Sequence, residues 1–385
     1  MIPRTAADTI HGLASSFPVV SITGPRQSGK TTLTQAIFSD RPYVSLEDPD
    51  IREFATEDPR GFLAQFPDGA VLDEAQRCPE LFSYLQGVVD RDGRPGLFIL
   101  TGSQQFGLLS GITQSLAGRV AVLSLLPFSL RELENAHLAP DALDRLLLQG
   151  MYPPIYDRQV EPRIWYANYV QTYLERDVRQ LINVRDLALF QRFLRLCAGR
   201  SGQLINLTAL GNDSGVSHNT AREWLSVLEA SYILLRLPPH HRNFNKRLVK
   251  TPKLYFIDPG LAAYLLGIET PQQLLTHPAR GALFEGWVVS ELLKYRYNLA
   301  QPSNLYFWRD RTGNEVDIVI EQGETLVPVE VKAGQTVNPG FFKGLARWQR
   351  IAQQAAGTPW VVYAGEHSQT RQGVRVIPWR RLPEI

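Results

Sequence analysis

The sequence predicts an α/β protein with a parallel sheet in its first domain, a helical and winged-helix middle, and an α/β domain at the C-terminus. Three observations carry this prediction. A glycine-rich loop near residue 24 lies between an apolar, β-branched run and a helical pattern. Residues 140–200 have helical periodicity and few strand signals. Apolar and charged residues alternate in short segments between residues 305 and 332. We therefore expect domains at 1–135, 136–255 and 256–385.

Composition sets broad limits. A chain of 385 residues favours two or three domains, and 44% apolar with 20% charged residues is ordinary for a globular protein. The net charge of +2 means that any nucleic-acid binding must come from local patches. Cys78 and Cys197 lack metal-ligand spacing, and so few cysteines favour a reducing compartment. No apolar core of a signal peptide and no membrane-length apolar run occur, so we expect a cytoplasmic protein without a membrane span.

Residues 24–31 match the phosphate-loop pattern G-x-x-x-x-G-K-[ST] at every fixed position. The strand-like run 19–23 precedes the loop and the helical pattern 31–38 follows it, as the motif requires. Such a loop turns backbone N–H groups toward phosphate oxygens, and the helix N-terminus adds partial positive charge. Lys30 is expected to reach the β- and γ-phosphates, and the Thr31 hydroxyl to hold Mg²⁺. The predicted nucleotide-binding residues are Gly24, Pro25, Arg26, Gln27, Ser28, Gly29, Lys30, Thr31 and Thr32.

A second short apolar strand ends in two carboxylates, Asp73 and Glu74. Asp73 is expected to hold Mg²⁺ through water, and Glu74 to polarise the attacking water. An Asp-Glu pair is also common as a helix cap. The position after an apolar strand, 43 residues beyond Lys30, favours the catalytic interpretation.

Further polar residues follow two later strands. Thr101 and Ser103 end the buried run 97–103 and are candidates to sense the γ-phosphate, as a polar residue does here in AAA-type ATPases. A plain strand-end turn is the alternative. Arg119 precedes the strand 120–123; it either neutralises phosphate charge in its own or a neighbouring subunit's site, or is a surface arginine. Arg26 is a second cation near the phosphates.

The middle of the chain resembles a helix-turn-helix module. A short helical pattern at 204–210, a glycine turn and a Ser-capped helix at 217–229 are followed by a strand at 232–237, which predicts a winged helix. Arg222 lies on the exposed face of the second helix. DNA contact and protein contact both remain open for this face.

The stretch 238–256 contains five lysines and arginines and no acidic residue. Contact with DNA phosphates is one interpretation, and a solvated edge strand protected by lysines is the other. The candidate DNA-binding residues are Arg222, Arg242, Lys246, Arg247 and Lys250.

The last domain carries a constellation of acidic residues and one lysine. Glu285 lies near the start of an amphipathic helix, and a turn at Gly313-Asn314 joins two predicted strands. A carboxylate, Asp317, followed about a dozen residues later by Glu330-x-Lys332, is the signature of the restriction-endonuclease-like core. Glu285, Asp317 and Glu330 are expected to bind Mg²⁺ or Mn²⁺, with Lys332 positioning or activating water. A surface hairpin with alternating charges, or an inert or DNA-gripping module, is the alternative.

Nearly the whole chain resembles prokaryotic AAA-superfamily ATPases whose C-terminal domain is built on a restriction-endonuclease-like core. The resemblance implies ATP binding and a three-part architecture. The residues that carry it are Gly24–Leu33, Leu72-Asp73-Glu74, Leu100–Ser103, Ser115–Arg119, Tyr173–Asp177, Lys246–Lys250, Lys253–Asp258, Glu315-Val316-Asp317 and Val329–Lys332.

Two functions fit this pattern. The first is an ATP-fuelled, homo-oligomeric enzyme, with a hexameric ring as one form, that grips or cuts DNA, branched DNA included. The second is a nucleotide switch that regulates or defends through protein partners and has an inactive nuclease-like domain. The winged helix and the basic stretch favour the first, and the near-neutral net charge favours the second.

Overall fold

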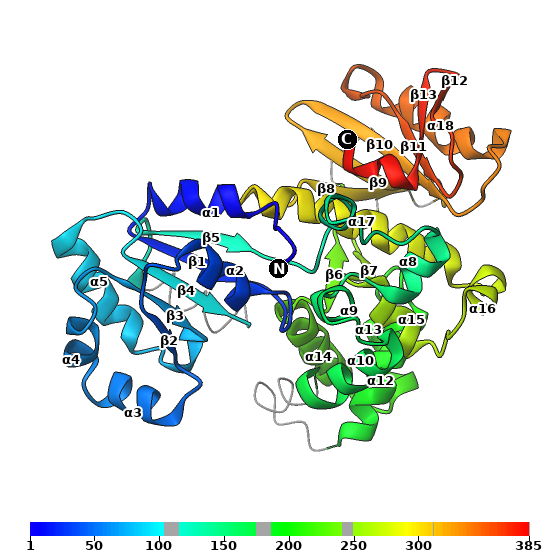
Figure 1. The fold of residues 1–385 in the computed structure, drawn as a ribbon. Helices are drawn as coiled ribbons and strands as arrows, with labels where there is room; N and C mark the ends of the chain where they lie inside the picture. The colour runs from blue at the N-terminus through cyan, green and yellow to red at the C-terminus, as the bar shows by residue number, and fades with distance from the viewer. Residues whose placement is uncertain (104–114, 175–185, 241–248, 311, 385) are drawn as a thin grey trace. The chain divides into compact units, whose positions relative to one another are not determined.

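The computed structural model describes residues 1–103, 115–174, 186–240, 249–310 and 312–384. The chain forms two compact units (Figure 1). The first contains residues 1–128, 230–232 and 294–302, and the second contains residues 129–229, 233–293 and 303–385. The expected middle and C-terminal domains thus share the second unit, and their division at residue 255 stays a prediction.

The first unit is built on a five-stranded sheet in the order β2-β3-β4-β1-β5, in which all neighbouring strands are parallel. This confirms the α/β class and the parallel sheet. All parallel carboxyl ends lie at one edge, and β4 lies between β3 and β1, so the ends of these three strands meet. The strands are β1 Val19–Thr23, β2 Tyr43–Ser45, β3 Ala70–Asp73, β4 Phe98–Gly102 and β5 Val120–Ser124.

Helices cover both faces of this sheet. The strands carry apolar side chains on both faces, and each face must be shielded from water. On one face, Val20 and Ile22 pack with Ile10 and Leu33 from α1 and α2. On the other face, α3, α4 and α5 cover a second cluster that includes Leu72. The helices are α1 Ala7–Ala14, α2 Lys30–Ile37, α3 Pro49–Glu57, α4 Pro59–Ala64 and α5 Leu81–Asp92, with the short 3₁₀ helix η1 Ala75–Arg77.

The second unit begins with helices, as the sequence predicts. Trp224 of α14 packs edge-on against Phe190 and Phe193 of α12. Gly215, at φ 82°, ends α13 and makes the turn into α14. The helices are α7 Leu130–Asn135, α8 Leu143–Gln149, α9 Pro153–Asp157, α10 Pro162–Asn168, α12 Leu187–Gly199, α13 Leu207–Ser214, α14 His218–Ala230, α15 Pro259–Leu265, α16 Pro271–Thr276 and α17 Arg280–Asn298, with the π-helical η2 Tyr169–Leu174. The antiparallel pair β6 Leu234–Leu237 and β7 Lys253–Phe256 follows α14 and precedes α15.

The C-terminal part is a six-stranded mixed sheet in the order β12-β13-β11-β10-β9-β8. The neighbours β8–β9, β9–β10 and β12–β13 are antiparallel, and β10–β11 and β11–β13 are parallel. The three strands expected between residues 305 and 332 are confirmed. The strands are β8 Leu305–Arg309, β9 Glu315–Gln322, β10 Thr325–Lys332, β11 Trp360–Tyr363, β12 Gln369–Arg371 and β13 Val374–Pro378. The helical segments are η3 Pro339–Phe342, α18 Lys343–Ala352, η4 Gln353–Ala355 and η5 Trp379–Glu384.

Two compositional expectations can be followed into the structure. Cys78 and Cys197 are both buried and free of disulfide bonds. Among the helices in the described ranges, none combines the length and apolar character that a membrane crossing requires.

Candidate functional site

The loop after β1 has a backbone that only glycine can adopt at two places. Gly24 has φ 149°, and a Cβ atom there would lie 2.1 Å from the carbonyl oxygen of Leu125. Gly29, at φ 92°, is the residue before the first turn of α2. These two glycines let the chain turn sharply from the end of β1 into the helix N-terminus.

Two polar side chains of the loop are buried. Lys30 is 6% exposed, and its Nζ donates to the carbonyl oxygens of Gly24 and Pro25 at 2.9 and 2.8 Å. Ser28 Oγ is buried and has no hydrogen-bond partner among the described residues. A buried hydroxyl without a partner costs roughly 1–3 kcal/mol, so this atom is suited to a ligand such as a phosphate oxygen.

Arg4 supports the loop from outside the motif. Its guanidinium donates to the carbonyl oxygens of Ser28 and Leu126, both at 2.6 Å, and lies 4.9 Å from the ring centre of Phe128. Sequence reasoning missed this residue, because a single arginine near the N-terminus carries no motif. Arg4 fixes the conformation of the phosphate loop through its backbone.

The two predicted Mg²⁺ ligands lie beside each other. Thr31 Oγ1 donates to Asp73 Oδ2 at 3.1 Å, and Thr101 Oγ1 donates to the other oxygen, Asp73 Oδ1. A hydroxyl and a carboxylate at the end of a parallel strand are the oxygen ligands that Mg²⁺ prefers. The residues present therefore fit a Mg²⁺ ion accompanying a bound nucleotide.

Glu74 has an unusual backbone. Its φ of 54° lies in the left-handed region, which costs energy for a side chain other than glycine. Ser103 Oγ donates to Glu74 Oε2 at 3.1 Å, and Gln76 Nε2 donates to the same oxygen. Both polar residues predicted at the end of β4, Thr101 and Ser103, thus contact the carboxylates that end β3.

Tyr43 is a partner of Asp73 that sequence reasoning did not find. Its hydroxyl donates to Asp73 Oδ2 at 2.5 Å. Burial, together with the hydrogen bond and the negative charge of Asp73, raises the pKa of Tyr43, so the hydroxyl stays protonated and remains a donor. A tyrosine at a strand start is common, and only the pairing of β2 with β3 brings it to Asp73.

The other loop residues surround these contacts. Arg26 lies 3.8 Å from Glu47 in an ion pair. Pro25 is buried, Gln27 has φ 64°, and Thr32 is exposed on the first turn of α2. Their predicted roles at the nucleotide stay predictions.

Arg119 lies at the opposite end of the sheet from the loop. It precedes Val120, which pairs with Val19 at the start of β1, whereas the loop follows Thr23 at the end of that strand. A five-residue strand spans roughly 16 Å. Arg119 pairs with Asp90 instead, and the structure does not bring it to the loop of its own chain.

The DNA-binding candidates are only partly within the described residues. Arg222 is exposed on α14 and donates to Asn219 Oδ1 at 3.0 Å. Lys250 is also exposed. The candidates Arg242, Lys246 and Arg247 lie outside the described residues.

The C-terminal sheet brings together most of the predicted nuclease-like set. Lys332 Nζ lies 3.3 Å from Asp317 Oδ2 and also forms an ion pair with Glu330. The backbone N–H of Val331 donates to the same Asp317 oxygen at 2.9 Å. The alternation predicted for β9 and β10 therefore places Asp317, Glu330 and Lys332 on one face.

A second lysine, from β7, joins this cluster. Lys253 is 2% exposed, and its Nζ lies 3.0 Å from Glu285 Oε1 and 2.5 Å from Glu315 Oε1. The Tyr255 hydroxyl also donates to Glu285. Sequence reasoning counted Lys253 within the basic stretch, because nothing local shows that β7 lies against the Glu285 helix.

These contacts do not fit a metal ion. Among the described residues, no group of three or more His, Cys, Asp or Glu side chains is arranged to hold one. The predicted ligands Glu285, Asp317 and Glu330 instead accept hydrogen bonds from Lys253 and Lys332, whose ammonium groups supply positive charge. Burial and the charge of Asp317 raise the pKa of Glu285 to about 7 and that of Glu330 to about 8.

Comparisons with known proteins agree with the first unit. A family model described as an AAA domain matches residues 16–134. Two models of domains of unknown function, DUF8612 and DUF4143, match residues 140–272 and 280–382.

Two mycobacterial proteins are similar over almost the whole chain. Uncharacterized protein Mb2031c of Mycobacterium bovis and uncharacterized protein Rv2008c of Mycobacterium tuberculosis are each 33% identical over 368 residues. The alignment covers 94% of this chain and 80% of each relative. The chain belongs to their family. Its N-terminal domain is an AAA-type phosphate-loop ATPase domain, as the sequence predicts.

Solved structures also align with the chain. The Walker-type ATPase PABY2304 of Pyrococcus abyssi is 15% identical, with a TM-score of 0.49, over 69% of this chain and 96% of that one. AMPPCP-bound DnaA from Aquifex aeolicus is 15% identical, with a TM-score of 0.31, over 58% of this chain and 85% of that one.

Proposed function

We propose that this protein is an ATP-hydrolysing AAA-type enzyme that acts on DNA. The observation that carries the ATPase part is the contact of Thr31 with Asp73 beside a loop in which Lys30 is buried. A phosphate-binding lysine, a metal-ligating hydroxyl and a carboxylate pair at the end of one strand are the parts that phosphoryl transfer requires.

The chain's own residues divide the work. Mg²⁺, when bound through Thr31 and Asp73, supplies charge neutralisation for the β- and γ-phosphates. Lys30 Nζ exchanges its bonds to loop carbonyls for bonds to phosphate oxygens, and Ser28 Oγ gains an acceptor. Glu74 orients and polarises the attacking water.

Positioning residues complete the ATPase site. Ser103 and Gln76 hold the Glu74 carboxylate through hydrogen bonds to the same oxygen, Oε2. Thr101 and Tyr43 hold Asp73 through its two different oxygens, Oδ1 and Oδ2. All four donors are uncharged, so none of them offsets the negative charge that a metal ion or a polarised water requires.

Several features support DNA as the substrate. The succession α12, α13, α14, β6, β7 has the order of a winged helix, with Arg222 exposed on α14. The succession α17, β8, β9, β10, α18, β11 supports the restriction-endonuclease-like core. Because lysines neutralise its carboxylates, we propose that this core holds DNA rather than cuts it, and cleavage with Mg²⁺ or Mn²⁺ stays a sequence prediction.

Assembly and location complete the proposal. We propose a cytoplasmic homo-oligomer in which Arg119 reaches the phosphates of a neighbouring subunit. In support, the Arg119 side chain is 35% exposed and lies at the sheet edge remote from its own loop. A hexameric ring is one assembly that would place this edge beside another subunit's site.

The test is ATP turnover by the full chain with duplex, single-stranded and branched DNA. The proposal predicts many-fold stimulation by at least one DNA. A nucleotide switch acting through protein partners, the alternative that the near-neutral net charge of +2 supports, would turn over ATP slowly and at the same rate with every DNA. Stimulation by none of the three would overturn the DNA assignment and leave the ATPase assignment standing.

A further inference from the structure

The C-terminal part of the chain carries a concentration of positive charge outside the candidate site. Residues 333–383 contain seven lysines and arginines and one acidic residue, Glu366, in a chain whose total net charge is only +2. Sequence reasoning singled out residues 238–256 and missed this region, because its charges are spread over 51 residues rather than gathered in one run. Folding places three of them on one helix and a fourth, Arg371, beside the start of that helix.

Three of these cations lie on one helix. Lys343, Arg347 and Arg350 are all exposed on α18, at the i, i+4 and i+7 spacing that places residues on one helix face. The opposite face of α18 is buried through Leu345 and Trp348. The outer face of α18 therefore carries a row of positively charged side chains, and the packing of its inner face fixes the position of the helix.

The β12–β13 hairpin continues this charge. Phe342, next to Lys343, packs in one core cluster with Val374 and Val376 of β13. The Arg371 guanidinium lies 5.7 Å from the ring centre of Phe342, which ties β12 to the start of α18. Arg375 lies between Val374 and Val376 on β13, so its side chain lies on the sheet face opposite α18, against the ring of Trp360. The ring of Phe342 holds the Arg371 guanidinium in place and leaves its N–H donors available.

Within the described residues, no carboxylate forms an ion pair with Lys343, Arg347, Arg350 or Arg371. Some exposed arginines elsewhere, such as Arg94 and Arg163, are paired, whereas others are not, so the clustering of these four cations is what distinguishes this surface. Clustered cations without partners repel one another, and a polyanion relieves that repulsion.

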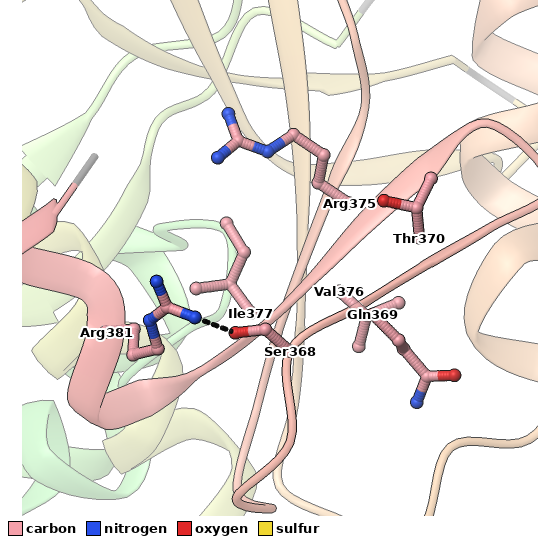
Figure 2. A pocket seen from close by; sticks show the side chains of 7 residues that line it. All are labelled: Ser368, Gln369, Thr370, Arg375, Val376, Ile377 and Arg381. Atoms are coloured by element: carbon pink, nitrogen blue, oxygen red, sulfur yellow. Dashed lines mark hydrogen bonds between the residues drawn. The ribbon is translucent and has the colours of Figure 1, made fainter.

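A shallow hollow lies beside this hairpin (Figure 2). It has a volume of about 280 Å³ and is lined mostly by polar side chains, including Thr370 and Gln369. Figure 2 shows Arg381 donating to Ser368 Oγ, at 2.9 Å, while Arg375 extends away from that pair. Thr370 and Arg375, which line the hollow, lie on the sheet face opposite α18, so the hollow is separate from the charged face of that helix.

We propose that the outer face of α18 and the β12–β13 hairpin form a binding surface for the phosphate backbone of DNA. The proposal rests on the proposed action on DNA, and it names the residues that would hold the backbone: Lys343, Arg347, Arg350 and Arg371. Lysine and arginine contacts to phosphates do not depend on the base sequence, so this surface is expected to bind DNA of any sequence.

The experiment measures binding of a 30-base-pair duplex to the full chain across salt concentrations. The test variant carries K343Q, R347Q, R350Q and R371Q. The matched control carries R60Q, R91Q, R131Q and R375Q, which also removes four exposed cations that form no ion pair with a carboxylate of the described residues. We expect the slope of log affinity against log salt to fall by about two to four in the test variant, and affinity at ~0.1 M salt to fall at least tenfold. The control should bind as wild type, apart from a small loss from net charge.

Each outcome decides something. If both variants lose affinity equally, net charge and not this surface is responsible, and the inference is overturned. If wild type binds and the test variant binds equally well, the inference fails while the proposed action on DNA stands. If wild type binds no DNA at low salt, both fail. Unchanged ATP turnover without DNA in the test variant shows that the fold is intact.

Discussion

The phosphate loop site and the C-terminal carboxylate cluster both contain acidic side chains, but the groups that donate hydrogen bonds to these carboxylates differ. In the first, Asp73 and Glu74 accept hydrogen bonds from the neutral groups of Thr31, Tyr43 and Ser103. In the second, carboxylates face the ammonium groups of Lys253 and Lys332. Neutral donors position a carboxylate and leave its negative charge available to a ligand. Ammonium donors also position it, but their positive charge neutralises it. The kind of donor therefore separates a site built for a metal and nucleotide from one that is complete within the protein.

The largest expected effect is a loss of ATP affinity when Lys30 is removed from the phosphate loop. Lys30→Ala removes the cation beside the loop carbonyls of Gly24 and Pro25. Loss of a phosphate-binding ammonium should weaken ATP binding by roughly 100-fold or more. Titration with a fluorescent ATP analogue measures this, and Lys343→Ala, on α18, is the matched lysine control. ATP affinity equal to wild type in Lys30→Ala would contradict the assignment of the loop.

A smaller effect is expected when Lys253 is removed from the C-terminal carboxylate cluster. Lys253→Met leaves Glu285 and Glu315 without their shared ammonium, which should destabilise the protein by about 3–5 kcal/mol. Buried carboxylates that have lost their cation should then recruit another one. We expect millimolar Mn²⁺ to raise the melting temperature of this variant by several degrees more than that of nucleotide-free wild type.

A double variant controls for that experiment. Lys253→Met with Glu285→Gln removes a carboxylate as well, so the extra response to Mn²⁺ should disappear. Mn²⁺ at the phosphate loop acts equally on all three proteins and cancels in the comparison. A wild-type protein stabilised by Mn²⁺ as strongly as Lys253→Met, with the gain lost on Asp317→Asn, would show that the cluster holds a metal despite its lysines.

Local signals in the sequence were enough for the sheet and the loop. The apolar run 19–23 and the glycines at 24 and 29 predict β1 and the turn into α2, because these constraints act within a few residues. The alternation along β9 and β10 likewise predicts that Asp317, Glu330 and Lys332 share a face. In these segments, residues close together in the sequence determine the structure, so the sequence pattern alone predicts it.

Contacts made by distant residues could not be predicted in this way. Tyr43 meets Asp73 only because β2 pairs with β3, and Arg4 contacts Ser28, which lies 24 residues further along the chain. Lys253 meets Glu285 only because β7 lies against α17. Tyr43, Arg4 and Lys253 belong to no catalytic or metal-binding motif of the sequence. The carboxylate motif by itself predicts a metal centre, but Lys253 places an ammonium group against Glu285, where that prediction has a metal ion.

The most direct test of the central claim is ATP turnover by Glu74→Gln. Glutamine keeps the size of the side chain and spares Thr31 and Asp73, but it lacks the charge that polarises water. We predict ATP binding close to wild type, with turnover reduced by at least 100-fold, measured by phosphate release under saturating ATP and Mg²⁺. Turnover at the wild-type rate would show that Glu74 does not orient the attacking water, and the account of the site would be wrong.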